Sequence, residues 1–176
     1  MHLNLENQCL TDEKLVQILR RIDGTQIQFL KLRNNNLTEQ SLRSIGYWLY
    51  ASSKHTQNPI ELKEVDLSEN LDLLRKGDAA KYCVQLLRQC TKLTSLSLGN
   101  TSLDSTSFQY IAKYLLQYNR SLKYFDASGL HNTIEFCYDQ STLEQTREKL
   151  YSFLLTNRYS KLDTSVAVQE PILLCA

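Results

Sequence analysis

Five segments of this chain share one spacing of apolar residues, and this repetition limits the possible folds more than any other feature of the sequence. Three copies are clear: IQFLKLRNNNL from Ile27, LKEVDLSENLD from Leu62 and LTSLSLGNTSL from Leu93. Two are weaker: LKYFDASGLHN from Leu122, and a partial copy made of Leu3, Leu5, Gln8 and Leu10. All follow the template LxxLxLxxNxL, and successive copies lie 27, 35, 31 and 29 residues apart. A chain of this kind repeats one structural unit along its length.

Each copy predicts a short strand followed by a turn. Apolar residues at alternate positions give a strand one buried face. The ninth position, occupied by Asn35, Asn70 and Thr101, falls where the chain leaves the strand. We expect its side chain to form hydrogen bonds with the backbone groups that the turn leaves unpaired.

Between the copies, the spacing of apolar residues changes to that of amphipathic helices. The clearest stripe is Phe108, Ile111, Ala112, Leu115 and Leu116. The other stripes are Leu15, Ile18, Leu19 and Ile22; Leu42, Ile45 and Leu49; Ala79, Cys83, Leu86, Leu87 and Cys90; and Leu143, Leu150, Phe153 and Leu154. A residue suited to N-capping precedes each stripe, at Thr11 or Asp12, Thr38, Asp78, Ser105 and Ser141.

This alternation of strand and helix resembles the leucine-rich repeat family, and the long, helix-containing period resembles its ribonuclease-inhibitor subclass. The resemblance covers roughly residues 1–130. It implies an α/β fold: a short right-handed solenoid, or horseshoe, with about five parallel strands on the concave side and helices on the convex side. Similar repeats occur in the ligand-sensing regions of intracellular immune receptors and in a GTPase-activating protein.

The two ends of the chain lead to different expectations. Residues 131–176 leave the repeat pattern, so we expect a loop, a helix over about residues 142–158 and a tail that together cap the solenoid. At the other end, no polar capping element precedes the first predicted strand at Leu3. An exposed solenoid end carries unpaired backbone groups. Two interpretations remain open: the chain is a piece of a larger protein, or this end is covered by a partner or by self-association.

The concave face is the binding surface that the resemblance implies. Phe29 and Tyr124 fall in one column of this face, and aromatic side chains on a solvent-facing sheet are candidate anchors for a partner. The charges also separate along it, with a basic patch at Lys31 and Arg33 followed by an acidic patch in the next copy. A mixed surface of this kind suits a complementary protein surface. The predicted partner-binding residues are Phe29, Lys31, Arg33, Glu64, Asp66, Tyr124 and Asp126.

A second group of aromatic residues lies in the predicted helices. Tyr110, Tyr114 and Tyr118 are spaced by four and form one stripe. Three more aromatic residues, Tyr47, Trp48 and Tyr50, lie in the helix that begins after Thr38. We expect both groups to pack sideways between neighbouring helices. The alternative is a protein contact on the convex side.

Composition argues against several classes of ligand. The formal net charge is +1, which leaves no excess of positive charge for nucleic acid or for an anionic membrane surface. The five cysteines are odd in number and form no CxxC pair, so we expect free, mostly packed thiols in a reducing, cytoplasmic compartment. The composition is rich in Asn, Gln, Tyr and Lys, which mildly favours an AT-rich bacterial or protist genome and hence an effector acting in host cytosol.

We expect no catalytic, metal or cofactor site. The three histidines lie far apart and have no ligand spacing with Cys or carboxylates. One motif, Cys137-Tyr138-Asp139, resembles the Cys-x-Asp nucleophile motif of the bacterial leucine-rich-repeat ubiquitin ligases. Only 37 residues follow Asp139, which is too few to build the surroundings that lower the pKa of a reactive thiol.

The sequence therefore predicts a module without enzymatic activity that binds another protein through its concave face. It predicts no nucleic acid, membrane or small-molecule substrate as a ligand. The alternatives are an enzyme or enzyme regulator, acting in ubiquitin transfer through Cys137 or on a GTPase, and the sensing or scaffold fragment of a larger protein.

Overall fold

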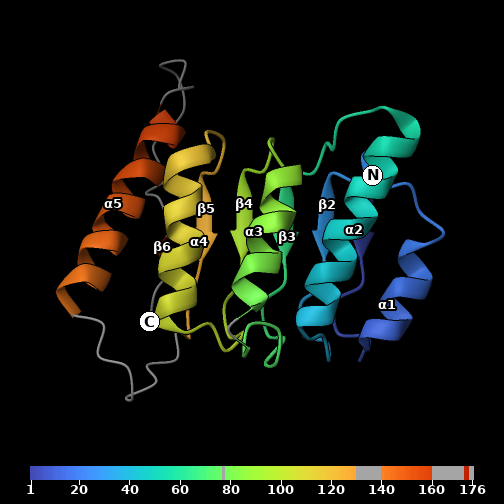
Figure 1. Ribbon diagram of the computed structural model, residues 1–176, viewed down its shortest axis with the longest axis horizontal. Coiled ribbons are helices and arrows are strands. Elements are labelled where there is room, and N and C mark those ends of the chain that lie inside the picture. Colours follow the sequence, from blue (N-terminus) through green and yellow to red (C-terminus); the bar gives the residue numbers. More distant parts are fainter. Residues whose placement is uncertain (77, 130–139, 160–172, 175–176) are drawn as a thin grey trace.

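The computed structural model describes residues 1–76, 78–129, 140–159 and 173–174. Strands and helices alternate along the chain (Figure 1). The elements are β1 (His2–Asn4), α1 (Asp12–Leu19), η1 (Gly24–Gln26), β2 (Phe29–Lys31), α2 (Glu39–Thr56), β3 (Glu64–Asp66), α3 (Ala79–Gln89), β4 (Ser95–Ser97), α4 (Ser105–Tyr118), β5 (Tyr124–Asp126), α5 (Gln140–Tyr159) and β6 (Leu173–Leu174).

The strands form one parallel sheet whose spatial order is the order of the chain, from β1 to β6. The five predicted strands are confirmed, since each copy of the repeat supplies one of them. The last strand, β6, was not predicted. It lies in the expected C-terminal tail, pairs with β5 and extends the sheet. Its two residues are too few to show the alternation that identifies a strand.

The strands pair so that residues at the same template position face one another. The third position gives the row His2, Phe29, Glu64, Ser95 and Tyr124, and the fifth gives Asn4, Lys31, Asp66, Ser97 and Asp126. Between these rows, the fourth position of β2 to β5 gives Leu30, Val65, Leu96 and Phe125, which are fully buried. The template therefore fixes the register of the sheet as well as its strands.

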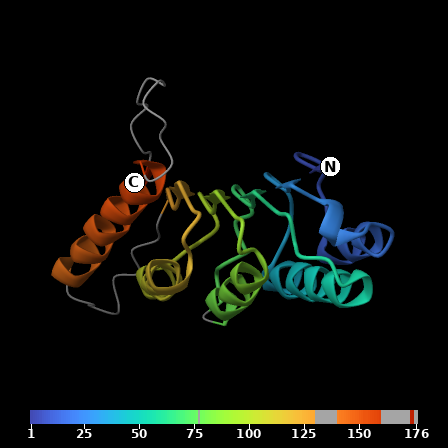
Figure 2. The ribbon, with the colours of Figure 1, turned by 90° about the horizontal axis from the view of Figure 1, so that it is seen from above.

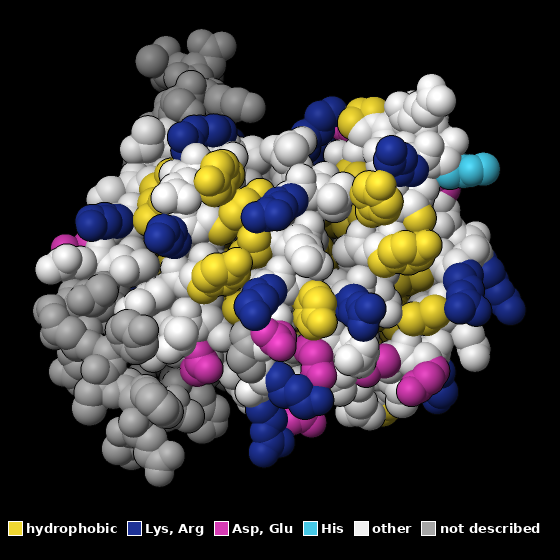
Figure 3. Space-filling model, in the orientation of Figure 1, with side chains coloured by type: hydrophobic (Ala, Val, Ile, Leu, Met, Phe, Trp, Pro, Cys, Tyr) yellow, Lys and Arg dark blue, Asp and Glu magenta, His cyan; other side chains and the backbone are white. Residues whose placement is uncertain are grey.

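The helices all lie on one side of the sheet (Figure 2). They stand in chain order, and their outer surface faces the viewer in Figure 3. The core fills the layer between helices and sheet, where the rings of Phe108 from α4 and Phe125 from β5 stack with centroids 6.2 Å apart. No helix that the structure describes covers the other side of the sheet, which we call the open face. It is formed by the third, fifth, seventh and eighth template positions.

The asparagines at the ninth position bind backbone groups of the turns, as predicted. The Asn70 amide is fully buried, and its Oδ1 accepts hydrogen bonds from the backbone N–H groups of Asn35 and Leu37 in the preceding copy. Its Nδ2 donates to the carbonyls of Leu32, Leu67 and Ser68. Asn35 does the same for the first copy, whereas the hydroxyl of Thr101 donates one bond, to Leu98 of its own copy. Each amide therefore holds the turn of the copy before it.

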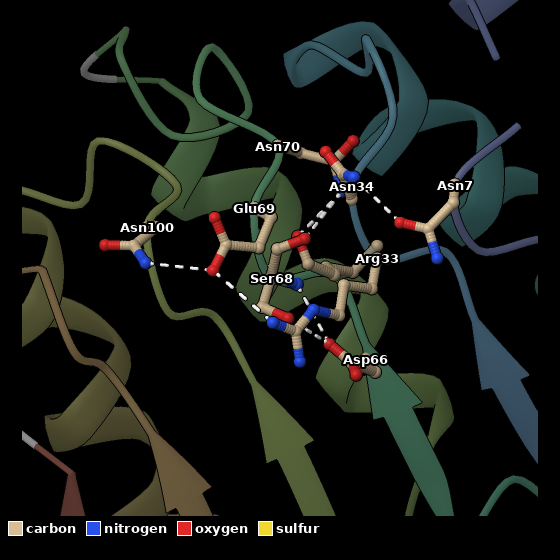
Figure 4. A network of polar contacts seen from close by, with 9 residues as sticks. Asn7, Arg33, Asn34, Asp66, Ser68, Glu69, Asn70 and Asn100 are labelled. Carbon is tan, nitrogen blue, oxygen red and sulfur yellow. Dashed lines mark hydrogen bonds and ion pairs between the residues drawn. The ribbon is translucent and has the colours of Figure 1, made fainter. Parts of the chain in front are cut away.

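The eighth position adopts a left-handed backbone conformation in every copy, which the sequence analysis missed. Its residues are Asn7, Asn34, Glu69, Asn100 and Gly129, with φ of 58°, 53°, 60°, 54° and 70°. Their side chains also meet across copies: Asn34 donates to Asn7 at 2.7 Å and Asn100 donates to Glu69 at 3.1 Å (Figure 4). The signal was present in the sequence, because Asn and Gly tolerate this conformation better than other residues.

One of the predicted caps forms the expected side-chain hydrogen bond. Thr11 and Asp78 directly precede α1 and α3 but accept no capping bond, and α5 begins at Gln140, before Ser141. The Thr38 hydroxyl accepts a hydrogen bond from Gln40 N–H at the start of α2, as expected. In α4 the cap is Asp104, whose carboxylate accepts from Ser107 N–H at 2.6 Å, and Ser105 is the first helical residue. The helix predicted near the C-terminus is confirmed as α5, which buries Leu150 and Leu154 beside α4.

A buried carboxylate joins α2 to the segment before α3. Glu39 lies in the first turn of α2, is 7% exposed, and accepts a hydrogen bond from the Lys76 ammonium at 2.7 Å. This bond lowers the pKa of Glu39, against the opposite effect of burial. The folded chain therefore holds the Glu39 carboxylate in its charged form to a lower pH than the unfolded chain does.

We expect the replacement Lys76→Met to lower the free energy of unfolding at neutral pH, with a loss that shrinks as the pH falls. The stability that the pair contributes is present above the ordinary Glu pKa of 4.5 and is lost as the pH falls through the lowered pKa of Glu39. Urea titrations at about pH 7, 5 and 3 measure this difference. Lys81→Met is the control, because Lys81 pairs with an exposed carboxylate, Asp78. Equal losses in both variants at every pH would contradict the assignment.

Candidate functional site

The structure places all seven predicted partner-binding residues on the open face. Phe29 and Tyr124 occupy the same row, separated by Glu64 and Ser95. The next row holds Lys31, Asp66 and Asp126, and Arg33 follows two positions after Lys31. Six of the seven are half-buried, and Arg33 is exposed. The side chains are therefore held partly by their neighbours and remain accessible from the open face.

One aromatic residue on this face has a partner that the sequence analysis did not assign. The rings of His2 and Phe29 stack at a centroid distance of 4.0 Å and an interplanar angle of 9°. His2 occupies the third position of the first copy, so the register of the repeat places it beside Phe29. The repeat therefore contained the signal for this contact, although the first copy was too incomplete to show it. His2 covers part of Phe29 and leaves Tyr124 as the aromatic residue at the other end of the row.

The two charged patches predicted on this face are not separate, which is a correction. Lys31 Nζ lies 3.3 Å from Glu64 Oε1. Arg33 Nη2 lies 3.6 Å from Glu69 Oε1 (Figure 4). The basic and acidic residues lie on adjacent strands, so they neutralise one another across about 4.8 Å. The linear sequence placed these groups 33 and 36 residues apart, which hid their pairing.

The carboxylates of Asp66 and Asp126 remain without a cationic partner among the described residues, and they flank Ser97 in the fifth-position row. Both are held in place: Asp66 Oδ1 accepts from the N–H and hydroxyl of Ser68, and Asp126 Oδ1 accepts from Ser128 N–H. They are two strands apart, or about 10 Å. One partner cation between them can interact with both.

Tyr124 forms one wall of this acidic area. Partial burial raises the pKa of its hydroxyl, as do the nearby carboxylates of Asp126 and Asp66, while a hydrogen bond with Ser97 lowers it. The Tyr124 side chain therefore stays neutral and presents an apolar ring beside two negative charges. That combination suits a side chain with an aliphatic stem and a cationic end.

The floor of the acidic area depends on a residue without a side chain. A Cβ atom on Gly99 would lie 2.8 Å from Asp126 Oδ2 and 2.6 Å from the Ser128 hydroxyl. Gly99 therefore lets these two side chains lie close over β4. The area is built from small residues (Ser95, Ser97, Gly99 and Ser128) between larger acidic and aromatic ones.

Glu69 lies at a position whose left-handed backbone conformation is unfavourable for a glutamate. It is the only one of the five eighth-position residues that is neither Asn nor Gly, and a left-handed conformation costs such a residue about 1 kcal/mol. Its carboxylate nevertheless joins Arg33 to Asn100 across three strands. Backbone strain of this kind is common where a side chain serves a binding surface.

We expect Glu69→Gly to raise the free energy of unfolding by about 0.5–1 kcal/mol, because relief of the backbone strain exceeds the loss of an exposed ion pair. Gly129→Ala is the reciprocal test. Its Cβ would lie 2.1 Å from Asn100 Oδ1 at a φ of 70°, so we expect a loss of about 1–2 kcal/mol. Chemical denaturation measures both. A destabilised Glu69→Gly variant would show that the Glu69 contacts outweigh the strain.

The helix-side aromatic residues agree with our expectation only in part, because Trp48 is buried beside Ile22 whereas most of the tyrosines are exposed. Tyr110 and Tyr118 are 47% and 68% exposed, and Tyr47 is 72% exposed, so they do not pack between helices. Tyr114 does so in part, since it contacts Tyr118 and lies under the Arg88 guanidinium, 5.9 Å from its ring centroid. An amphipathic stripe predicts which residues share a helix face. It does not predict how closely the next helix approaches.

The described residues show little that is suited to catalysis. Within residues 1–76, 78–129 and 140–159, no three His, Cys, Asp or Glu side chains gather as metal ligands do, and no helix is long and apolar enough to cross a membrane. Burial raises the pKa of the Cys83 and Cys90 thiols to about 12, so they are not activated as nucleophiles. Among the described cysteines, Cys83 and Cys90 are free and buried and Cys9 is free and exposed, in agreement with the expectation of mostly packed thiols. The Cys137 motif lies outside the described residues.

Comparisons with known proteins assign no family to the chain. No family model matches it, and no curated protein matches it either.

Proposed function

We propose that the chain is a short right-handed solenoid of the leucine-rich repeat family, similar to the ribonuclease-inhibitor subclass. Three observations support this proposal. Each copy of the template supplies one parallel strand, the same template positions pair throughout the sheet, and the ninth-position amides bind the turn backbone. Parallel strands joined through helices on one face take right-handed connections in nearly all proteins.

We further propose that the chain acts in the cytosol as a protein-interaction module, with the open face as its binding surface. The observation that carries the proposal is the acidic area beside Tyr124, where Asp66 and Asp126 lack a cationic partner within the described chain. One oxygen of each carboxylate bonds to the turn that follows it, at Ser68 or Ser128, but the negative charge of each still lacks a cationic partner beside an accessible aromatic ring. The carboxylates and the ring are complementary to a basic and apolar segment of a partner protein.

The charges of the open face restrict the partner further. The cations Lys31 and Arg33 are paired with Glu64 and Glu69, so the negative charge without a cationic partner near the ends of the strands comes from Asp66 and Asp126. The other amines of this side, Lys63 and Lys123, lie one position before the strands begin. A bound segment therefore presents its Lys or Arg over Ser97, near the ends of the strands. Its acidic residues, if it has any, lie toward the beginnings of the strands.

The experiment starts with capture of partners from a eukaryotic lysate, with cross-linking to locate the contact, followed by titration of the purified partner. We expect Tyr124→Ala to weaken binding at least tenfold, which corresponds to about 1.4 kcal/mol. Asp126→Asn should weaken it less, with an effect that decreases at high salt. Tyr118→Ala is the matched control, because Tyr118 is an exposed tyrosine on the helix side. A partner that binds Tyr124→Ala and wild type equally, with the fold intact, excludes the open face.

A further inference from the structure

A second surface, on the helix side, has the features of a binding groove. A cavity of about 1000 Å³ opens between α1 and α2 and contains Val16, Leu19, Tyr47, Trp48 and Ala51 among its apolar lining residues. Hydrophobic side chains gather over α2 and beside α1 in this region, and Lys and Arg side chains flank them (Figure 3). The residues involved differ from those of the open face, so the inference does not depend on the function proposed above.

The groove exists because the two helices differ in length. α1 has 8 residues and α2 has 18, or about 12 Å and 27 Å of helix. α1 therefore covers less than half of the side of α2 that faces away from α3. The α2 residues that line the groove run from Gln40 to Thr56 in steps of three and one, which is one continuous stripe of about 24 Å.

The floor of the groove is fixed by Trp48. Its ring is buried, and its Nε1 donates a hydrogen bond to the Ile22 carbonyl at 2.8 Å. Gly24 packs against the same ring, since a Cβ there would lie 3.1 Å from it. Tyr47, by contrast, is 72% exposed at the side of the groove. The groove thus combines a rigid apolar floor with an accessible aromatic side chain, as binding sites for helices do.

The charge of the groove identifies the chemistry of the ligand. Arg20, Arg21 and Arg43 line it, and no carboxylate of the described chain forms an ion pair with any of them. The one acidic lining residue, Asp23, already accepts hydrogen bonds from the N–H and hydroxyl of Thr25. Guanidinium groups at the edges of an apolar floor are complementary to carboxylates.

We propose that this groove binds an acidic amphipathic helix of a partner protein. The length of the α2 stripe corresponds to about 16 residues of helix. The apolar residues of the ligand, at i, i+3, i+4 and i+7, would rest on Leu19, Trp48 and Ala51, and its flanking Asp or Glu residues would reach Arg20, Arg21 and Arg43. A long apolar floor favours an amphipathic helix over nucleic acid as the ligand. Nucleic acid would interact only with the arginines of the groove.

The test uses the full chain and three synthetic helical peptides of about 16 residues. The first carries a Leu stripe flanked by Glu, the second carries Lys in place of each Glu, and the third has the composition of the first in scrambled order. We expect fluorescence-anisotropy titrations to give binding of the first peptide at least tenfold tighter than of the other two. The double variant Arg20→Glu/Arg43→Glu should lose this preference and bind the Lys-flanked peptide better than wild type does.

The controls separate the groove from general electrostatic attraction. Lys113→Glu reverses an exposed charge on α4, outside the groove, and should leave binding of the acidic peptide unchanged. Tyr47→Ala should weaken it severalfold without changing the charge. Equal binding of the acidic and scrambled peptides, or no effect of the double variant, overturns the proposal. Saturable binding to duplex DNA or to phosphatidylserine vesicles in preference to the acidic peptide also overturns it.

Discussion

Replacement of Asn70 by Ala is expected to lower the free energy of unfolding by at least about 3 kcal/mol. The Asn70 amide makes five hydrogen bonds to backbone groups, and its side chain is fully buried. A backbone group that loses its partner out of reach of water costs about 1–3 kcal/mol. Urea denaturation with an unchanged slope measures the loss.

The controls for Asn70 come from the next copy of the repeat. Thr101 occupies the same template position and makes a single bond, at 2.6 Å to the Leu98 carbonyl. Thr101→Val preserves its shape and is expected to cost about 1 kcal/mol. Asn70→Thr should fall between these values, because a hydroxyl can still reach Leu67. Equal costs for Asn70→Ala and Thr101→Val would show that the amide bonds do not hold the turns.

Replacement of Phe125 by Ala is expected to cost about 3–5 kcal/mol. The Phe125 side chain is fully buried in β5, and its ring stacks on Phe108 of α4. Its removal leaves a cavity between the sheet and the helix layer, directly beneath the strand that carries Tyr124 and Asp126. Thermal and chemical denaturation measure the loss, and partner titration should show weaker binding through the same disturbance.

Phe125→Leu separates cavity formation from the loss of the aromatic ring. Leu fills most of the volume, so we expect a cost below about 1.5 kcal/mol. Phe153→Ala is the control for removal of an aromatic ring from a less buried position, since Phe153 in α5 is only partly buried. If Phe125→Ala cost no more than Phe153→Ala, the layer between β5 and α4 would not be the closely packed core described above.

The repeat made most of the fold predictable from the sequence. Its template located the five strands and their register, because Leu30, Val65 and Leu96 must all reach the same core. The sixth strand was not predicted, because Leu173 and Leu174 form too short a segment to show an alternation of apolar and polar residues. The left-handed eighth position was not predicted because the template LxxLxLxxNxL marks it only as variable, although three asparagines and a glycine occupy it.

The sequence predicted which residues form the candidate site, but it did not predict how their charged side chains pair. The template showed that Lys31, Glu64 and Asp66 share a face, and the structure places them there. It did not show which cation meets which carboxylate, because pairing depends on side-chain reach across strands. Lys31 and Glu64 lie 3.3 Å apart, whereas Asp66 bonds to Ser68 instead. The groove between α1 and α2 was missed for a related reason, as it results from a difference in helix length.

The amides of the ninth position give the chain a direction during its synthesis. Asn35 completes the turn of the first copy, and Asn70 completes the turn that contains Asn35. The first and second copies therefore carry unpaired turn groups on leaving the ribosome, until Asn35 and Asn70 respectively have been made. The turn groups at the start of the chain obtain hydrogen-bond partners only when residues about 30 positions later have been made. The copies therefore become stable in pairs rather than singly.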